Sequence, residues 1–452
     1  MVGRVPGLPS APRWIASAVG ALTGAALVMT SSALPAFASV SPTPASGTPQ
    51  LAATGTTEQI RQLVQCGQTM YAVGSFTLIR RFSTTYARNN IFSFSAVAPY
   101  KVTTWNPDVN GVVNSIAFNG TNCATAYIGG KFTTVHGTRA ANIAAISTST
   151  GAVQASFAHS ANGQVETLAS RNGHLLVGGY FTSLNGSSAD KYMASLNPAT
   201  GKDDGFIRLS ISGNYQYCNP AGTQCASSNN TRVYNQQISH GGTLDLVEGD
   251  FTSVGGRPRQ QIFMLNLSGP TATVTSWTSS AFDQHCGFSE PFYVRAASWS
   301  PSDSTVYIAT TGFHPFDWDG SFPLTGLCDV AAAFPASQAQ VSATWINYTG
   351  CDSLYSTAAD STTAYFGGHE RWSQNANGCN EAGPGAISAP GMEGLSPSTG
   401  LLTFNPTRDR GLGADGMLVT TAGLWIASDN FQGSNVCGGV GGHAGICLLP
   451  YS

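Results

Sequence analysis

A short glycine–phenylalanine motif recurs along this chain and constrains its fold more than any other sequence feature. Residues 126–139 read Ala-Tyr-Ile-Gly-Gly-Lys-Phe-Thr-Thr-Val-His-Gly-Thr-Arg, close copies lie at 176–186 and 246–256, and a looser copy lies at 71–79. Three weaker copies keep the apolar entry and lose the Phe-Thr ending, at 306–314, 364–371 and 424–431. Seven copies spaced about 59 residues apart are typical of a repeat protein.

Each repeat unit contains four short β-rich runs, here named strands A to D. In the second unit they cover 112–118, 126–132, 142–147 and 152–157, with turn residues between them. We find no segment with a helical period. The sequence therefore predicts an all-β fold, a seven-bladed β-propeller of four-stranded antiparallel blades. Glycine in strand B should let neighbouring backbones approach closely.

The last unit is one strand short, because the chain ends after the run 445–450. We expect residues 50–55, which precede the first unit, to supply the missing outer strand. The alternative is a last blade of three strands.

The N-terminus is typical of a Sec-type signal peptide. Arg4 and Arg13 precede the uncharged apolar run 14–29, and residues 36–38 form an Ala-x-Ala cleavage site. The alternative is a membrane anchor, but the run is short for a span, so we expect cleavage after residue 38 and no stable span afterwards. The predicted organisation is a signal peptide at 1–38, a flexible Ser/Thr/Pro linker at 39–57 and the propeller at 58–452.

Composition limits the partners of a secreted or cell-envelope protein of this kind. The chain has 20 basic and 23 acidic residues, and only 10% of it is charged. A nucleic-acid-binding protein needs a basic footprint, which is absent here. We expect a monomer without cofactor or metal.

All ten cysteines lie beyond the signal segment, and an even count in an exported chain predicts disulfides. The strand assignment places cysteines of neighbouring units, or of paired loops, close together. The predicted pairs are Cys66–Cys123, Cys218–Cys225, Cys286–Cys328, Cys351–Cys379 and Cys437–Cys447.

The repeat resembles the delta-60 type propeller repeats of secreted bacterial proteins. The resemblance rests on Ile-Gly-Gly-Lys-Phe-Thr at 128–133, Thr-Gly at 150–151, Phe157, and Asn-Gly-Gln-Val at 162–165. It covers about half of the mature chain well and is degenerate in the last three units. It implies a propeller in an exported or surface protein, and it implies no catalytic residues.

Charged and aromatic residues gather in the loops of the last three units. In an antiparallel blade the B–C loops and the D–A loops share one face, so these side chains can meet. The ligand-binding candidates are His314, Asp317, Trp318, His369, Glu370, Arg371, Trp372 and Asp429. The D–A loops on the same face add eight further residues, which are His285, Glu290, Arg295, Asp352, Arg408, Asp409, Arg410 and Asp415.

A structural interpretation of these loops is equally open. Long loops can simply cover a propeller's centre, and Arg371 with Glu370 or Asp352 can be a plain ion pair. Residues 317–320, Asp-Trp-Asp-Gly, resemble the start of a calcium loop but lack its later ligands.

Two functions follow from this reading. The first is a secreted propeller that binds an extracellular ligand such as a polysaccharide or a protein, because aromatic faces beside polar groups suit sugars. The second is an extracellular glycan hydrolase or lyase, in which His369, Glu370 and Arg371 with Asp317 or Asp429 provide acid, base and charge stabilisation. The sequence does not decide between them.

Overall fold

The computed structural model describes residues 39–215, 230–284, 286, 292–312, 326–337, 339–406, 410–431 and 443–452. Contacts divide the chain into residues 1–36 and residues 37–452, and the second unit is described below. Its described residues form antiparallel strands and one short 3-10 helix, Ser280–Asp283. None of the helical segments described is long and apolar enough to cross a membrane.

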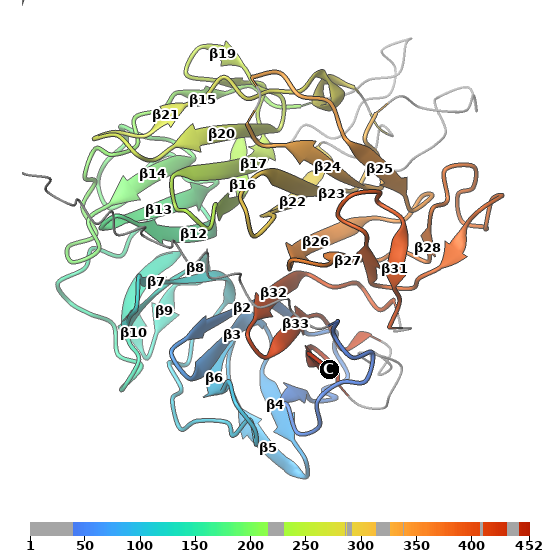
Figure 1. The fold of residues 1–452 in the computed structure, drawn as a ribbon. Coiled ribbons are helices and arrows are strands. Elements are labelled where there is room, and N and C mark those ends of the chain that lie inside the picture. The colour runs from blue at the N-terminus through green and yellow to red at the C-terminus, as the bar shows by residue number, and fades with distance from the viewer. Residues whose placement is uncertain are drawn as a thin grey trace, which may run out of the picture. The chain divides into compact units, whose positions relative to one another are not determined.

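Seven principal sheets follow one another along the chain, one for each repeat unit (Figure 1). Sheets 1 to 3 contain β2 (Gln59–Cys66), β3 (Thr69–Ser75) and β6 (Ile91–Ser95); β7 (Val112–Asn119), β8 (Asn122–Lys131) and β11 (Ile143–Ser147); and β12 (Val165–Arg171), β13 (His174–Gly179) and β14 (Met193–Leu196). Sheets 4 and 5 contain β16 (Arg232–Ile238), β17 (Leu244–Asp250), β20 (Ile262–Asn266) and β21 (Thr273–Val274); and β22 (Val294–Trp299), β23 (Thr305–Thr310), β24 (Val330–Pro335) and β25 (Trp345–Tyr348). Sheets 6 and 7 contain β26 (Leu354–Ala359), β27 (Ala364–Gly368), β30 (Glu393–Leu395) and β31 (Leu402–Phe404); and β32 (Gly416–Thr420), β33 (Gly423–Ala427) and β34 (Ile446–Pro450).

Strands A, B and C are neighbours in that order in all seven sheets, as expected, whereas strand D differs from sheet to sheet. It is a full strand in sheets 4, 5 and 6. In the first three sheets it shrinks to single bridges, such as Ile146 with Val153 in sheet 2. The repeated phenylalanines Phe76, Phe132, Phe181 and Phe251 are all buried.

Small hairpins and two-stranded additions decorate the principal sheets, and several of them arise from the loop that ends the repeat motif. In the second unit, Thr-Val-His-Gly-Thr-Arg folds back on itself because His136 and Gly137 both have positive φ. Two consecutive positive-φ residues match the twist of a hairpin. These additional strands are β1 (Gln50–Leu51), β4 (Leu78–Arg81), β5 (Thr84–Ala87), β9 (Thr134–Val135), β10 (Thr138–Arg139), β15 (Ile211–Ser212), β18 (Ser253–Val254), β19 (Arg257–Pro258), β28 (Trp372–Ser373) and β29 (Ile387–Ser388).

Hydrophobic side chains join each sheet to the next. There are seven clusters of buried residues: six connect successive sheets, and the seventh connects the last sheet to the first through Trp425 and Phe94. Tryptophans at strand D add directed contacts, since the Trp105 indole donates to the carbonyl of Ser147 in the following sheet at 2.9 Å. Within the described residues no single sheet closes on itself.

The segment at 39–57, expected as a flexible linker, is instead hydrogen-bonded to the rest of the unit. Val40 bridges Tyr451, Ser41 N–H donates to Pro450 at 2.7 Å, and Ala45 N–H donates to Leu448 at 2.8 Å. The segment that pairs with β34 therefore comes from residues 40–45, whereas in the segment 50–55 Gln50 and Leu51 form β1 and pair with β4. The prolines at 42 and 44 suggested disorder, but an edge strand tolerates proline because its outer N–H groups need no partner.

Three of the predicted disulfides are confirmed. They are Cys66–Cys123, Cys286–Cys328 and Cys351–Cys379, with Cα–Cα distances of 5.7, 5.5 and 4.6 Å. The first joins sheets 1 and 2, as the strand assignment required. Cys447 is also disulfide-bonded. Cys218, Cys225 and Cys437 lie outside the described residues.

Candidate functional site

A polar cavity of about 490 Å³ lies where the first strands of all seven sheets meet. Its wall includes residues of β2, β7, β12, β16, β22, β26 and β32. A second cavity of about 500 Å³ lies beside residues 39–42 and carries no ionisable group except Tyr365. The central cavity is the stronger candidate because it concentrates charge in a chain that has little.

The repeat motif itself builds the wall of this cavity. In six sheets strand A has a β-bulge at the same position, so one residue has no partner on strand B. A bulge re-aims a side chain. The residues at this position are Arg61, Asn114, Glu166, Tyr234, Arg295 and Tyr355, and all six line the cavity.

Sheet 7 places Asp415 at the corresponding point. Its N–H donates to the carbonyl of Ala427, and the next residue, Gly416, pairs with Ala427. Asp415 also lines the cavity. We name these seven residues, one from each sheet, the bulge ring.

In five of the six bulged sheets the second glycine of the motif pairs with the residue before the bulge and allows a close approach, whereas Thr310 takes this place in sheet 5. A Cβ atom at Gly130 would lie 2.1 Å from the carbonyl oxygen of Val112, and one at Gly179 would lie 2.3 Å from that of Gln164. The close approach expected from the sequence is therefore real, but it joins strands A and B of one sheet. The first glycine has another task, because a Cβ atom at Gly129 would meet Val165 of the next sheet at 2.3 Å.

Neighbouring members of the bulge ring contact one another. Arg61 Nη1 donates to Asn114 Oδ1 at 2.8 Å, and Asn114 Nδ2 donates to Glu166 Oε2 at 2.9 Å. Arg232, beside the ring, lies 3.8 Å from Glu166 Oε1. Part of the ring is thus a continuous network of polar contacts.

Arginine and aromatic side chains form a stack between sheets 4 and 5. The guanidinium carbons of Arg232 and Arg295 lie 4.7 and 4.6 Å from the centre of the Phe292 ring. The same carbons lie 5.5 and 5.3 Å from the centre of Tyr234. Cation–π contacts of this kind hold a guanidinium in place without neutralising it.

Burial changes the acidity of the carboxyl groups in the ring. It raises the pKa of Asp415 to about 7, although Arg61 opposes the shift, and Asp415 Oδ2 has no hydrogen-bond partner among the described residues. Burial also raises the pKa of Glu166, against the opposing charges of Arg232 and Arg61. Asp415 can therefore hold a proton near neutral pH, as general acids do.

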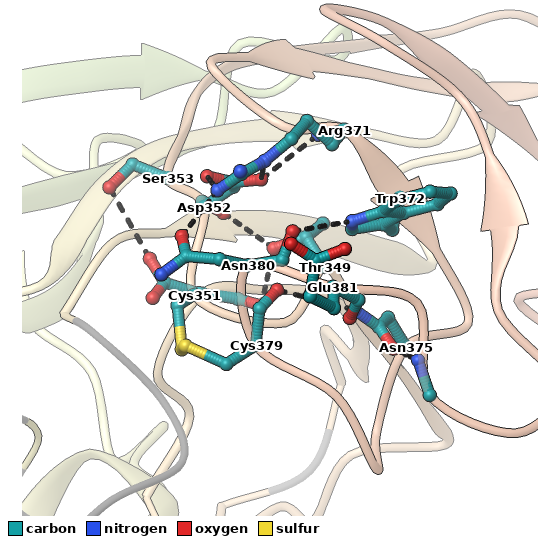
Figure 2. The surroundings of a disulfide bond; sticks show 12 residues. Thr349, Cys351, Asp352, Ser353, Arg371, Trp372, Asn375, Cys379, Asn380 and Glu381 are labelled. Atoms are coloured by element: carbon teal, nitrogen blue, oxygen red, sulfur yellow. Dashed lines mark hydrogen bonds and ion pairs between the residues drawn. A yellow bond between two sulfur atoms is a disulfide. The ribbon is translucent and has the colours of Figure 1, made fainter.

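The loop residues predicted from the sequence form a different arrangement (Figure 2). Arg371 binds Asp352 through Nε at 2.7 Å and Nη2 at 2.8 Å, and Arg410 donates to the same carboxylate at 2.8 Å. The Cys351–Cys379 disulfide lies next to this cluster. The arrangement matches the ion-pair interpretation of Arg371, with Asp352 as its partner.

The other described candidates also take local contacts. His369 Nδ1 lies 2.9 Å from the carbonyl oxygen of Gly411, and Trp372 Nε1 lies 3.4 Å from that of Asn380. Glu370 is fully buried. Neither these residues nor Arg371 belong to the wall of the central cavity. His314, Asp317 and Trp318 lie outside the described residues.

Asp429 hydrogen-bonds the backbone segment that precedes Asp415. Its Oδ2 accepts hydrogen bonds from the N–H groups of Leu412 at 2.9 Å and Gly413 at 3.0 Å, and its Oδ1 accepts from Phe431. The bonds from Leu412 and Gly413 fix the backbone just before Asp415.

Sequence reasoning named Arg295 and Asp415 among the loop charges but missed the bulge ring as a set. The signal was present, because in each unit a buried aliphatic residue opens strand A and the next residue belongs to the ring. Examples are Ile60 before Arg61 and Val165 before Glu166. Among the described residues no group of His, Cys, Asp and Glu could hold a metal ion.

Comparison with known proteins gives little further information. No protein-family model matches the chain, and no curated protein does. Among solved structures the chain is similar to hydrazine synthase of Kuenenia stuttgartiensis, with 10% identity, a TM-score of 0.45, and coverage of 81% of this chain and 92% of that chain. This similarity carries no information about ligand or activity.

Proposed function

We propose that this chain is an exported seven-bladed β-propeller that binds an extracellular saccharide in its central cavity. Seven successive antiparallel sheets, the packing of the last sheet on the first, and the edge strand from residues 40–45 support the propeller. The disulfides and the N-terminal segment with its Ala-x-Ala site support export.

The single observation that carries the binding function is the bulge ring. If the centre had only a structural role, aliphatic side chains would fill it. Instead, guanidinium, carboxyl, amide and phenol groups from all seven sheets line the cavity. Six bulges point these groups into one cavity, and bulges cluster at functional sites.

A saccharide fits this cavity better than a protein ligand does. Sugar hydroxyls both donate and accept hydrogen bonds, and the cavity offers both kinds of group, for example Asn235, Gln237 and Thr167. Tyr234 and Tyr355 add aromatic surface. A volume of about 490 Å³ lies in the range of small-ligand sites and is too small for a protein segment of any size.

The test is a binding measurement with a variant that fills the cavity. Gln237 is exposed and lines the cavity, whereas Gln65 is exposed on the first strand of sheet 1 and does not. We expect a glycan array to identify a ligand, and Gln237→Trp to weaken its binding about tenfold or more in calorimetry, while Gln65→Trp leaves it unchanged. Absence of any glycan binding, or full affinity in Gln237→Trp, would contradict the proposal.

A further variant tests the loop surface that the sequence predicted. If the Asp352–Arg371–Arg410 cluster and Trp372 also contact the ligand, Trp372→Ala will weaken binding. Unchanged affinity in that variant would restrict recognition to the central cavity.

Glycan cleavage is the second candidate, and it is favoured by the protonation of Asp415. A carboxyl group with a pKa of about 7 suits a general acid, and Glu166 is a second carboxyl group in the same cavity. In this case Asp415→Asn will bind the glycan and fail to release reducing ends. If the wild-type protein releases none from the glycan that it binds, the enzyme hypothesis is wrong.

A further inference from the structure

The charged groups of the central cavity differ in how easily a change of pH removes their charge. Arg61 and Arg295 line the cavity, and arginine stays charged at any physiological pH. The carboxyl groups that line it, Glu166 and Asp415, are neutralised more easily than usual because burial raises the pKa of each. The cavity therefore becomes more positive as protons bind.

Glu166 is already engaged by the protein. Its Oε2 accepts hydrogen bonds from Asn114 and from Gln164 at 3.2 Å, and Arg232 faces its Oε1. Its side chain is only 7% exposed. This carboxylate therefore holds neighbouring side chains of the cavity wall in place and has little surface that a ligand could contact.

The Arg61 guanidinium has N–H donors that a ligand could use. Among the described residues, its one hydrogen bond joins Nη1 to Asn114. A guanidinium carries five N–H donors in a planar fork, which matches the two oxygens of a carboxylate. Arg295, held by the aromatic stack, supplies a second guanidinium at the wall.

We infer that the saccharide bound in this cavity carries a carboxylate, as uronic acids do, and that Arg61 and Arg295 receive it. This inference rests on the proposed saccharide function and adds the chemical class of the ligand. A singly charged carboxylate suits the site better than a phosphate dianion, because Glu166 stays in the wall and limits the excess of positive charge.

The same geometry makes binding depend on pH through Asp415. The groups that act on this carboxyl are Gln59 and Arg61 of β2, Arg295 of β22, Tyr355 of β26, and Asp429 after β33. Below its pKa of about 7 the carboxyl is neutral and ceases to repel an anion. A uronate with a pKa of about 3.5 stays ionised at pH 6, so its affinity rises as the pH falls from 8 to 6.

The test compares an oligogalacturonate with its fully methyl-esterified form, which has the same sugar backbone and no charge. We expect the acid to bind about tenfold or more tightly than the ester, the scale of a charge-assisted hydrogen bond, and expect added salt to weaken only the acid. Arg61→Gln and Arg295→Gln should lose this preference, and Arg139→Gln, an exposed arginine on β10, should keep it. Thermal unfolding of each variant shows whether it is folded.

Asp415→Asn provides a second, independent readout. It should bind the acid at pH 8 as tightly as the wild type does at pH 6, and lose the pH dependence. Equal binding of acid and ester would overturn the inference and leave saccharide binding intact. Failure of every glycan to bind the folded protein would overturn both, and displacement of the uronate by inorganic phosphate at equal concentration would overturn the preference for a carboxylate.

Discussion

At the scale of single residues, each position of the repeat motif has a different structural role. The second glycine allows the bulge, the residue after the buried aliphatic enters the cavity, and the phenylalanine fills the core. Glu248 departs from the pattern, because it stands where sheets 2 and 3 have their first glycine, and it is fully buried. The motif is therefore a set of steric requirements and not a binding sequence.

The glycine requirement gives the first prediction. In Gly130→Ala, the new Cβ would overlap the carbonyl oxygen of Val112, so the bulge that carries Asn114 must shift. We expect the free energy of unfolding to fall by about 1–3 kcal/mol, as in an overpacked core. Chemical denaturation measures it.

Gly269→Ala is the matched control, because Gly269 is exposed and its nearest neighbour atoms are 3.3 Å away or more. It should change stability by no more than about 0.5 kcal/mol. Equal effects of the two substitutions would show that close approach at Gly130 has no special importance.

At the scale of elements, the edge of the last sheet is completed by a segment remote in sequence. Residues 40–45 run beside β34, and Ser452 N–H donates to the carbonyl of Ser39 at 3.1 Å. An uncovered edge strand would present unpaired N–H and C=O groups to other chains. The segment thus ties the two ends of the unit together and covers that edge.

The second prediction concerns this strand. Ser41→Pro removes the N–H that donates to Pro450, whereas Ser41→Ala keeps it. We expect Ser41→Pro to lower the free energy of unfolding by about 1–3 kcal/mol, the cost of leaving a backbone acceptor unpaired, and to increase self-association. Thermal unfolding and size-exclusion chromatography test it, and indistinguishable behaviour of the two variants would argue against pairing at this edge.

At the scale of the whole unit, buried carboxyl groups link stability to pH. Burial raises the pKa of Glu393 to about 7, although the neighbouring Ser373 opposes the shift, and it raises the pKa of Asp245 and Glu248 well above the usual range. The folded state therefore binds protons that the unfolded state releases above about pH 4.3. Stability should fall as the pH rises from about 4.5 to 7.

Glu393→Gln tests this third prediction. The amide cannot ionise, so the variant should be more stable than the wild type at pH 8 and similar to it at pH 4.5. Denaturation across this pH range measures the difference, and Glu381→Gln, at an exposed carboxylate, should follow the wild type. A wild type whose stability rises between pH 5 and 7 would refute the argument.

The sequence by itself determined the all-β class, the seven units, the order of strands A to C, and three cysteine pairs that the structure confirms. These are local matters, since strand periodicity and turn residues act within one repeat. The flexible linker at 39–57 was a wrong prediction, because composition cannot show that the segment pairs with the edge of a sheet formed by residues far away in the sequence.

Only the tertiary structure decided where the candidate site lies. The bulge residues Arg61, Glu166 and Asp415 are separated by more than a hundred residues from one unit to another. They converge because six equivalent bulges and the corresponding point of the seventh sheet face one space, and a bulge is a property of paired strands. The loop charges at 369–372 looked more prominent in sequence, yet Arg371 is bound to Asp352 and leaves the central cavity to the residues of the ring.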